Sequence, residues 1–268
     1  MALQSILLTM TNILVENTIY LVKGFYVKKL FLLLFVVLLF IACGDGKNVE
    51  PDTITFTAKD GLTVTADLYK TANENAPYII LFHQAFFSRG EYKTIAPRLN
   101  SLGYNCLAVD QRSGLYCKGT INQTASKARK LRLDRKYIHA LPDLRASFLY
   151  VRDELKARKI IIWGSSYSSS LAFVLASEYP NDINGLLAFS PGEYFKDNDK
   201  KIIDYATSVK CPVFVTAEKK IKEQAKGIYD KAQSGNKVFL DVKKHGSRLL
   251  WDPKTAVWEE AIKFIKSI

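Results

Sequence analysis

The fold is decided by the stretch Ile160–Leu171, which reads IIIWGSSYSSSL. Its apolar start predicts a strand buried on both faces, and the small residues after it predict a tight turn into a helix. In a G-x-S-x-G turn the residues two before and two after the serine must be small, because the backbone turns too sharply for larger side chains. Gly164 and Ser168 fill those places, with Ser168 where glycine is usual. The turn therefore centres on Ser166 as a candidate nucleophile, although these serines could instead serve only as helix caps.

Strand and helix patterns alternate on both sides of this stretch. An alternating hairpin with an Asp60-Gly61 turn comes first and spans Asp52–Leu68. Further strands are expected at 78–82, 104–109, 185–189, 213–216 and 237–242, and helices at 89–102, 140–156, 168–177, 219–233 and 252–266. Residues 111–139 show no strand pattern, so a loop or short helix over the sheet edge is expected there. The order predicts an α/β fold: a mostly parallel central sheet, opened by an antiparallel hairpin, with helices on both faces.

Composition excludes several classes of protein. The chain has 268 residues, 48% of them hydrophobic and 24% charged, which is a globular balance rather than a disordered one. Its four cysteines form no CxxC pair, which argues against a disulfide scaffold and a structural zinc site. No cofactor or metal motif occurs, and the chemistry expected below requires none.

The net charge of +12 includes a basic run, KARKLRLDRK, at 127–136. This run could attract anionic substrates, contact anionic lipid headgroups, or be a solvated face of a basic protein. Aromatic residues do not interleave with its charges, which argues against nucleic acid as a partner.

The N-terminal part of the chain reads as an export signal. Residues 30–42, LFLLLFVVLLFIA, follow Lys28-Lys29 and end at Cys43. Thirteen apolar residues are too few to span a membrane, but they are typical of a secretory signal. The segment resembles a bacterial lipoprotein signal, which implies that Cys43 is lipid-modified and becomes the mature N-terminus. We expect a signal at 1–42, a lipidated tether at 43–52 and one domain at 53–268. An uncleaved anchor is the alternative, and either reading predicts an exported protein held at a membrane.

Five segments carry a resemblance to the α/β-hydrolase family over 53–268, closest to its dienelactone-hydrolase-like and bacterial serine esterase branches. They are LFHQAFFSRGEY at 81–92, LAVDQRSG at 107–114, GSSYSS at 164–169, AFSPGEYF at 188–195 and HGSRLLW at 245–251. The resemblance implies an oxyanion hole made by the backbone amides of Ala85 and Tyr167, with His83 organising the loop. It further implies a serine hydrolase, foremost a carboxylic-ester hydrolase, acting on a small-molecule ester or acyl substrate.

Three histidines compete for the role of general base. His245 follows the last strand and comes after Ser166 in the chain, which is the order this fold uses. His83 ends a strand in the oxyanion segment, and His139 lies in the basic region as a surface or packing residue. We therefore expect His245 to be the base.

The acid of the triad is not settled by the sequence. The resemblance places an Asp after the strand 213–216, but Lys220 stands there, and a lysine cannot orient an imidazole. Glu218 and Glu193 are nearly equal candidates, with Glu223 third and a Ser–His dyad without an acid also open.

A lipoprotein of this fold that binds a ligand or partner without turnover is the alternative function, with acyl transfer or peptide hydrolysis as a weaker third. The exported compartment also leaves a Cys117–Cys211 disulfide open.

Overall fold

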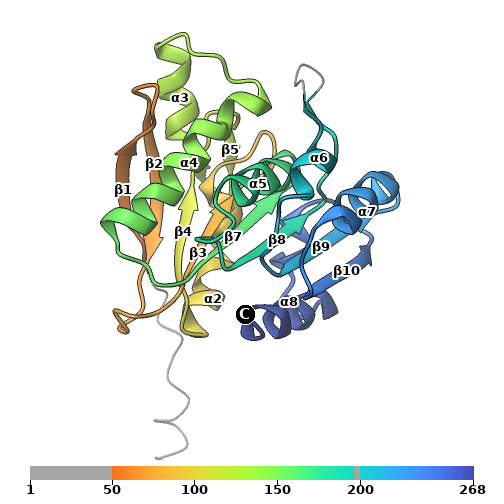
Figure 1. Ribbon diagram of the computed structural model, residues 1–268. Coiled ribbons are helices and arrows are strands. Elements are labelled where there is room, and N and C mark those ends of the chain that lie inside the picture. The colour runs from red at the N-terminus through yellow and green to blue at the C-terminus, as the bar shows by residue number, and fades with distance from the viewer. Residues whose placement is uncertain (1–49, 196–199) are drawn as a thin grey trace, which may run out of the picture. The chain divides into compact units, whose positions relative to one another are not determined.

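The computed structural model describes residues 50–195 and 200–268, and its centre is one eight-stranded sheet (Figure 1). The strand order is β1-β2-β4-β3-β7-β8-β9-β10. The strands are β1 (Asp52–Thr57), β2 (Thr63–Tyr69), β3 (Tyr78–Phe82), β4 (Asn105–Val109), β7 (Ile160–Ser165), β8 (Gly185–Phe189), β9 (Val213–Glu218) and β10 (Lys237–Val242). In this sheet the β1–β2 and β2–β4 pairs are antiparallel, and all the remaining pairs are parallel. The predicted fold class is confirmed.

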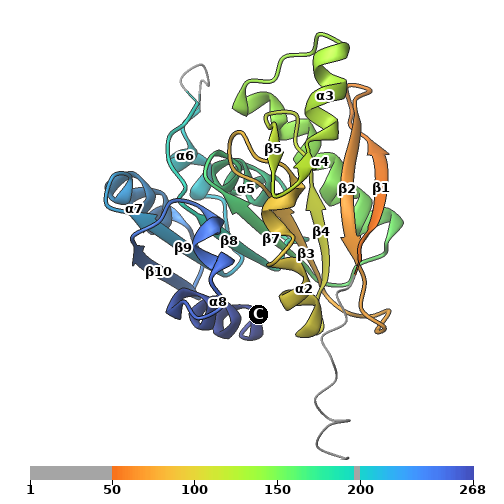
Figure 2. The ribbon, with the colours of Figure 1, turned by 180° about the vertical axis from the view of Figure 1, so that it is seen from behind.

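Helices cover both faces of the sheet, because the central strands are apolar on both sides. In β3, Ile80 and Phe82 pack on one face while Ile79 and Leu81 pack on the other, which is the period of two expected of a strand. The first face is covered by α4 (Leu141–Leu149), α5 (Tyr167–Glu178) and α7 (Lys222–Lys231), and α6 (Ile202–Ala206) packs against α5 and α7. The second face, turned toward the viewer in Figure 2, is covered by α2 (Ala96–Ser101) and α8 (Ala256–Lys266).

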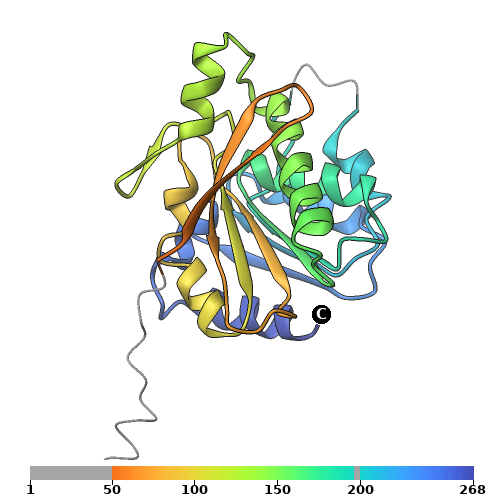
Figure 3. The same cartoon turned by 90° about the vertical axis from the view of Figure 1, so that its left-hand side faces the viewer.

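Three predicted elements differ in detail. The helix expected at 89–102 is a 3₁₀ turn, Arg89–Tyr92, followed by α2, which begins beside Pro97 because proline suits a first helical turn and disrupts an interior one. The helix expected at 140–156 is α4 followed by a π-helical turn, Tyr150–Glu154. Residues 111–139 contain a hairpin of β5 (Tyr116–Cys117) and β6 (Thr120–Ile121), then α3 (Gln123–Lys130), which projects beyond the end of the sheet (Figure 3).

Buried ion pairs fasten this segment to the sheet. Arg112 Nη2 lies 2.6 Å from Asp143 Oδ1, and Arg112 Nη1 lies 2.5 Å from Asp60 Oδ2. Arg89 Nη1 lies 2.7 Å from Asp110 Oδ2, whose carboxylate also accepts a hydrogen bond from the amide of Gln123. Both arginines are buried, so removing one partner would leave a charge without compensation. The start and the end of the segment are therefore held in place.

Two predictions fall outside the described residues. The export signal at 1–42 and the lipid attachment at Cys43 lie there, together with most of the tether. Within residues 50–195 and 200–268, no helix combines the length and the apolar character needed to cross a membrane.

Candidate active site

Ser166 sits at the strained turn between β7 and α5. Its backbone has φ +58° and ψ −127°, a conformation that is costly for a residue with a side chain and that concentrates at functional sites. A Cβ on Gly164 would lie 2.5 Å from Cα of Ser169, so only glycine fits two residues before the serine. Two residues after it, the hydroxyl of Ser168 accepts a hydrogen bond from the amide of Ser165 and donates to the carbonyl of Phe82. The strand, the turn and the helix occupy their predicted positions.

The structure brings Ser166, His245 and Glu218 into one hydrogen-bonded chain. Ser166 Oγ lies 2.7 Å from Nε2 of His245, and Nδ1 of His245 lies 2.7 Å from Oε1 of Glu218. The three side chains come from the turn after β7, the end of β9 and the loop after β10. These ends meet because parallel strands place their carboxyl termini at the same edge of a sheet.

The second carboxylate oxygen of Glu218 is also bound. Oε2 accepts a hydrogen bond of 2.9 Å from Ser190 Oγ, and Ser190 Oγ accepts one from the amide of Gly246. Burial on its own would raise the pKa of Glu218, but the hydrogen bonds from His245 and Ser190 outweigh it and hold the pKa below its usual value. Glu218 is therefore ionised at neutral pH, and it is tied to the loop that carries His245.

The other two candidate carboxylates lie elsewhere. Glu193 accepts hydrogen bonds from the amides of Ile202 and Ile203, at 2.8 and 2.9 Å, and so caps the start of α6 rather than reaching His245. Glu223 is exposed in the first turn of α7, and Lys220 is exposed in the turn before it. Of the three candidates, the structure brings only Glu218 to the histidine.

The amides of Ala85 and Tyr167 are both available to a ligand oxygen. No acceptor in the described part of the chain faces the amide of Ala85, which lies in the loop after β3. The amide of Tyr167 belongs to the first turn of α5, where helical amides lack acceptors within the helix. The positive end of the α5 helix dipole lies at this same N-terminus. The predicted positions are thus compatible with stabilising a negative oxygen beside Ser166.

His83 lies beneath this loop and links three segments. Its Nε2 accepts hydrogen bonds from the amide of Gln111 and from Nδ2 of Asn122, and its Nδ1 donates to the carbonyl of Gln84. Burial lowers the pKa of His83 to about 4, so the ring is neutral at pH 7. His139, by contrast, is exposed near Asp134.

Sequence reasoning missed Glu91, which joins the loops of the site. This buried carboxylate accepts hydrogen bonds from the amide of Gln84 and from Oγ of Ser165, both 2.8 Å long. Ser165 Oγ in turn accepts one from the amide of Ser247, two residues after His245. The spacing Ser88-x-x-Glu91 is also that of a helix-capping box, so the sequence pattern alone does not indicate a role for Glu91 in the site.

We expect Glu91 to make the stability of the protein depend on pH. Burial raises the pKa of Glu91 to about 7, although hydrogen bonds from Gln84 and Ser165 and the charges of Arg248 and Lys118 oppose the shift. Between pH 4.5 and 7 the folded protein then binds a proton that the unfolded chain does not, so the free energy of unfolding falls as pH rises. We expect a loss on the order of 1–3 kcal/mol over this range from Glu91, absent in Glu91→Gln.

The measurement is urea denaturation of wild type and Glu91→Gln at several pH values from 5 to 8. The difference between the two proteins is what matters, because His83, whose pKa is lowered, contributes with the opposite sign between pH 4 and 6.5. The exposed change Glu223→Gln should leave the wild-type profile intact. Parallel pH profiles for wild type and Glu91→Gln would contradict the prediction.

The described cysteines are free. Cys106, Cys117 and Cys211 are buried thiols, so the disulfide that the sequence left open between Cys117 and Cys211 is not formed. Burial also raises the pKa of Cys117 and of Cys211 to about 12, which keeps both thiols protonated and poorly nucleophilic. No group of His, Cys, Asp and Glu within the described ranges has the arrangement needed to hold a metal ion.

Comparison with known proteins agrees with this architecture. Residues 77–208 match the profile of the family described as alpha/beta hydrolase fold. No curated protein matches the chain in sequence. Among solved structures, the chain is similar to the Pyrococcus furiosus esterase Pf2001, with 18% identity, a TM-score of 0.64, and coverage of 82% of this chain and 90% of that one.

Two further solved structures have nearly the same similarity in shape. A dienelactone hydrolase from Anabaena variabilis has 15% identity and a thermostable carboxyl esterase from Bacillus coagulans has 13% identity. Each has a TM-score of 0.62 and is matched over 81% of this chain and 98% of its own. At these identities the likeness concerns the fold, and together with the sheet order and the turn at Ser166 it leads to one conclusion: this chain has the α/β-hydrolase fold.

Proposed function

We propose that this protein is a serine hydrolase that cleaves carboxylic esters through an acyl-enzyme on Ser166. The observation that carries the proposal is the continuous chain from Ser166 Oγ to His245 to Glu218, with both links 2.7 Å long. A nucleophile, a base and an orienting carboxylate in this arrangement define the Ser-His-acid triad whatever the fold that holds them.

In the first half of the reaction, Nε2 of His245 removes the proton of Ser166 as Oγ attacks the ester carbonyl carbon. The carbonyl oxygen becomes an oxyanion, and the amides of Ala85 and Tyr167 donate hydrogen bonds to it. Glu218 remains ionised and stabilises the imidazolium that forms, as its lowered pKa allows.

In the second half, His245 gives its proton to the leaving alcohol, and the acyl group stays on Ser166. A water molecule then loses a proton to His245 and attacks the acyl carbon. The bond to Ser166 Oγ breaks, His245 returns the proton to Oγ, and the carboxylic acid is released. Esters are the substrates favoured here because similar folds include an esterase and a carboxyl esterase, although those names describe the other proteins.

The test uses purified full-length protein, 4-nitrophenyl butyrate and a fluorophosphonate probe. We expect steady release of nitrophenol and an adduct of the probe on the peptide that contains Ser166. A protein that only binds a ligand would give neither signal, and an adduct on another serine would contradict the assignment of the nucleophile.

We also propose that the protein is exported and held at a membrane by a lipid on Cys43. The support is the sequence of residues 28–43 alone, a basic pair, an apolar run and a cysteine. Mass spectrometry of protein extracted from bacterial membranes should show a chain that begins at Cys43 and carries added acyl mass. Cys43→Ser should lack that mass, and a wild-type chain that retains residues 1–42 would contradict the proposal.

A further inference from the structure

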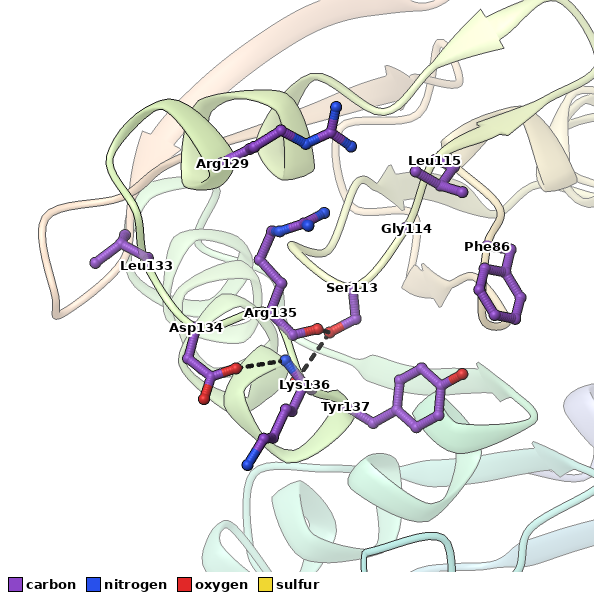
Figure 4. A pocket seen from close by; sticks show the side chains of 10 residues that line it. All are labelled: Phe86, Ser113, Gly114, Leu115, Arg129, Leu133, Asp134, Arg135, Lys136 and Tyr137. Atoms are coloured by element: carbon purple, nitrogen blue, oxygen red, sulfur yellow. Dashed lines mark hydrogen bonds between the residues drawn. The ribbon is translucent and has the colours of Figure 1, made fainter.

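A pocket of about 540 Å³ opens beside the candidate active site (Figure 4). One wall comes from the loop after β3 and from the segment after β4, including Phe86 and Ser113. The opposite wall comes from α3 and the residues that follow it, including Arg129, Arg135 and Tyr137. The pocket is therefore formed by the loop after β3 together with both ends of the segment 111–139.

Two lining residues of this pocket adjoin the residues whose amides we propose as the oxyanion hole. Phe86 lines it and directly follows Ala85 in the chain. Tyr137 lines it as well, and its ring stacks on the ring of Tyr167 with the centroids 4.6 Å apart. A substrate whose carbonyl oxygen bound these amides could thus extend part of itself into the pocket.

Two guanidinium groups point into this space. The side chains of Arg129 and Arg135 both reach toward the middle of the pocket in Figure 4. No carboxylate in residues 50–195 or 200–268 pairs with either of them. The acidic residue of the lining, Asp134, points away from them, accepts a hydrogen bond from the amide of Lys136 and lies 3.6 Å from His139 Nε2.

An exposed aromatic side chain adds an apolar wall. Phe86 is 64% exposed, and its backbone has φ +65°, a conformation that a bulky residue adopts at a cost. Strained backbone of this kind is found at ligand-binding sites, where it aims a side chain at its target. Leu115 and Tyr137 extend the apolar surface. The lining combines apolar contact area with positive charge.

The basic wall is held in a fixed position. The hydroxyl of Ser113 donates to the carbonyl oxygens of Arg135 and Lys136, at 2.8 and 3.0 Å. The neighbouring Arg112 is locked to Asp143 by the buried ion pair described above. Fixing the backbone in this way reduces the entropy lost when a ligand orders the Arg135 side chain.

From these observations we propose that the pocket binds a carboxylate group of the substrate, so that the preferred substrate is an anionic ester. Guanidinium groups pair with carboxylates through two parallel hydrogen bonds, and two of them in one pocket select a negative group at a defined distance from the ester. The inference rests on the proposed ester hydrolysis and adds the substrate class.

The experiment compares kcat/KM for anionic and neutral esters of similar size, using full-length protein. One arm pairs 4-nitrophenyl hemiglutarate with 4-nitrophenyl butyrate, which puts the carboxylate on the acyl side. The other arm pairs 4-acetoxybenzoate with its methyl ester, which puts the carboxylate on the alcohol side. We expect wild type to prefer the anionic ester by roughly 10-fold or more in one arm.

The variant Arg129→Gln/Arg135→Gln should lower kcat/KM for the preferred anionic ester by roughly 10- to 100-fold. For the neutral ester of the same pair, kcat/KM should change by less than about twofold. Lys130→Gln is the matched control, because it removes a positive charge from the same helix outside the pocket. It should keep the preference for the anionic ester.

The outcomes separate the inference from the function on which it rests. If the neutral esters are hydrolysed but neither arm shows a preference, the anionic substrate class is wrong and the hydrolase stands. The same holds if the preference survives in the double variant, or if Lys130→Gln weakens it as strongly. If no ester is hydrolysed, the proposed function fails and the inference fails with it.

Discussion

Replacing Ser166 by alanine is expected to lower kcat/KM for 4-nitrophenyl butyrate by roughly 10³-fold or more. The loss follows from the geometry, because Ser166 Oγ is the hydroxyl that lies 2.7 Å from His245 Nε2. Some activity above that of water should remain, since the amides of Ala85 and Tyr167 would still stabilise an oxyanion. Initial rates and labelling by the fluorophosphonate probe measure both effects.

Ser177→Ala provides the matched control. Ser177 lies near the end of the same helix, and its hydroxyl donates only to the carbonyl of Val174. It should keep wild-type activity within about twofold, because its hydroxyl contacts neither His245 nor the turn. Labelling of Ser166→Ala at the wild-type level would show that another residue is the nucleophile.

Glu218→Gln is expected to lower kcat by roughly 10²- to 10⁴-fold, with a smaller change in KM. The amide keeps the size of the side chain but removes the charge that stabilises the imidazolium, and it no longer enforces the tautomer of His245. Steady-state kinetics with 4-nitrophenyl butyrate provide the test, and thermal unfolding checks that the variant is folded.

Glu193→Gln is the chemically identical change at the competing position. Because Glu193 binds the amides of Ile202 and Ile203, its loss should cost about 1 kcal/mol of stability and leave kcat within a few-fold of wild type. If both variants lost activity equally, or if Glu218→Gln behaved as wild type, the assignment of the acid to Glu218 would be wrong.

These two glutamates also show where the sequence stopped being informative. Each follows the end of a predicted strand, and these strands, β8 and β9, are neighbours, so position along the chain does not separate the two glutamates. The sequence predicts a strand at 213–216, whereas β9 continues to Glu218, which pairs with Val242. That extension carries the carboxylate to the edge of the sheet, and it depends on pairing with β10, a partner distant in sequence.

The turn at Ser166 could be predicted because its constraints are local. A buried strand, small neighbours and a following helix are all contained within twelve residues, and steric exclusion at Gly164 leaves few other solutions. The network around Glu91 could not be predicted, because Gln84, Ser165 and Ser247 meet only after the sheet has formed.

The basic run 127–136 is an intermediate case. The sequence shows the charge of this run and suggests a single basic surface, whereas in the structure its side chains lie in different places. Helix α3 ends at Lys130, and Arg132 adopts φ +55°, which reverses the chain after the helix. Arg129 and Arg135 thereby face the same pocket, while Lys130 lies outside it.

The buried ion pairs of Arg89 and Arg112 have a consequence for how such a protein can evolve. They hold the two ends of residues 111–139, through Asp110 directly after β4 and through Asp143 on α4. If the proposed pocket holds the substrate, most of its lining is encoded on a separate stretch of chain from Ser166, His245 and Glu218. We therefore expect mutations between the two anchors to change selectivity while the reaction chemistry is preserved, so that new specificities could arise in small steps through active intermediates.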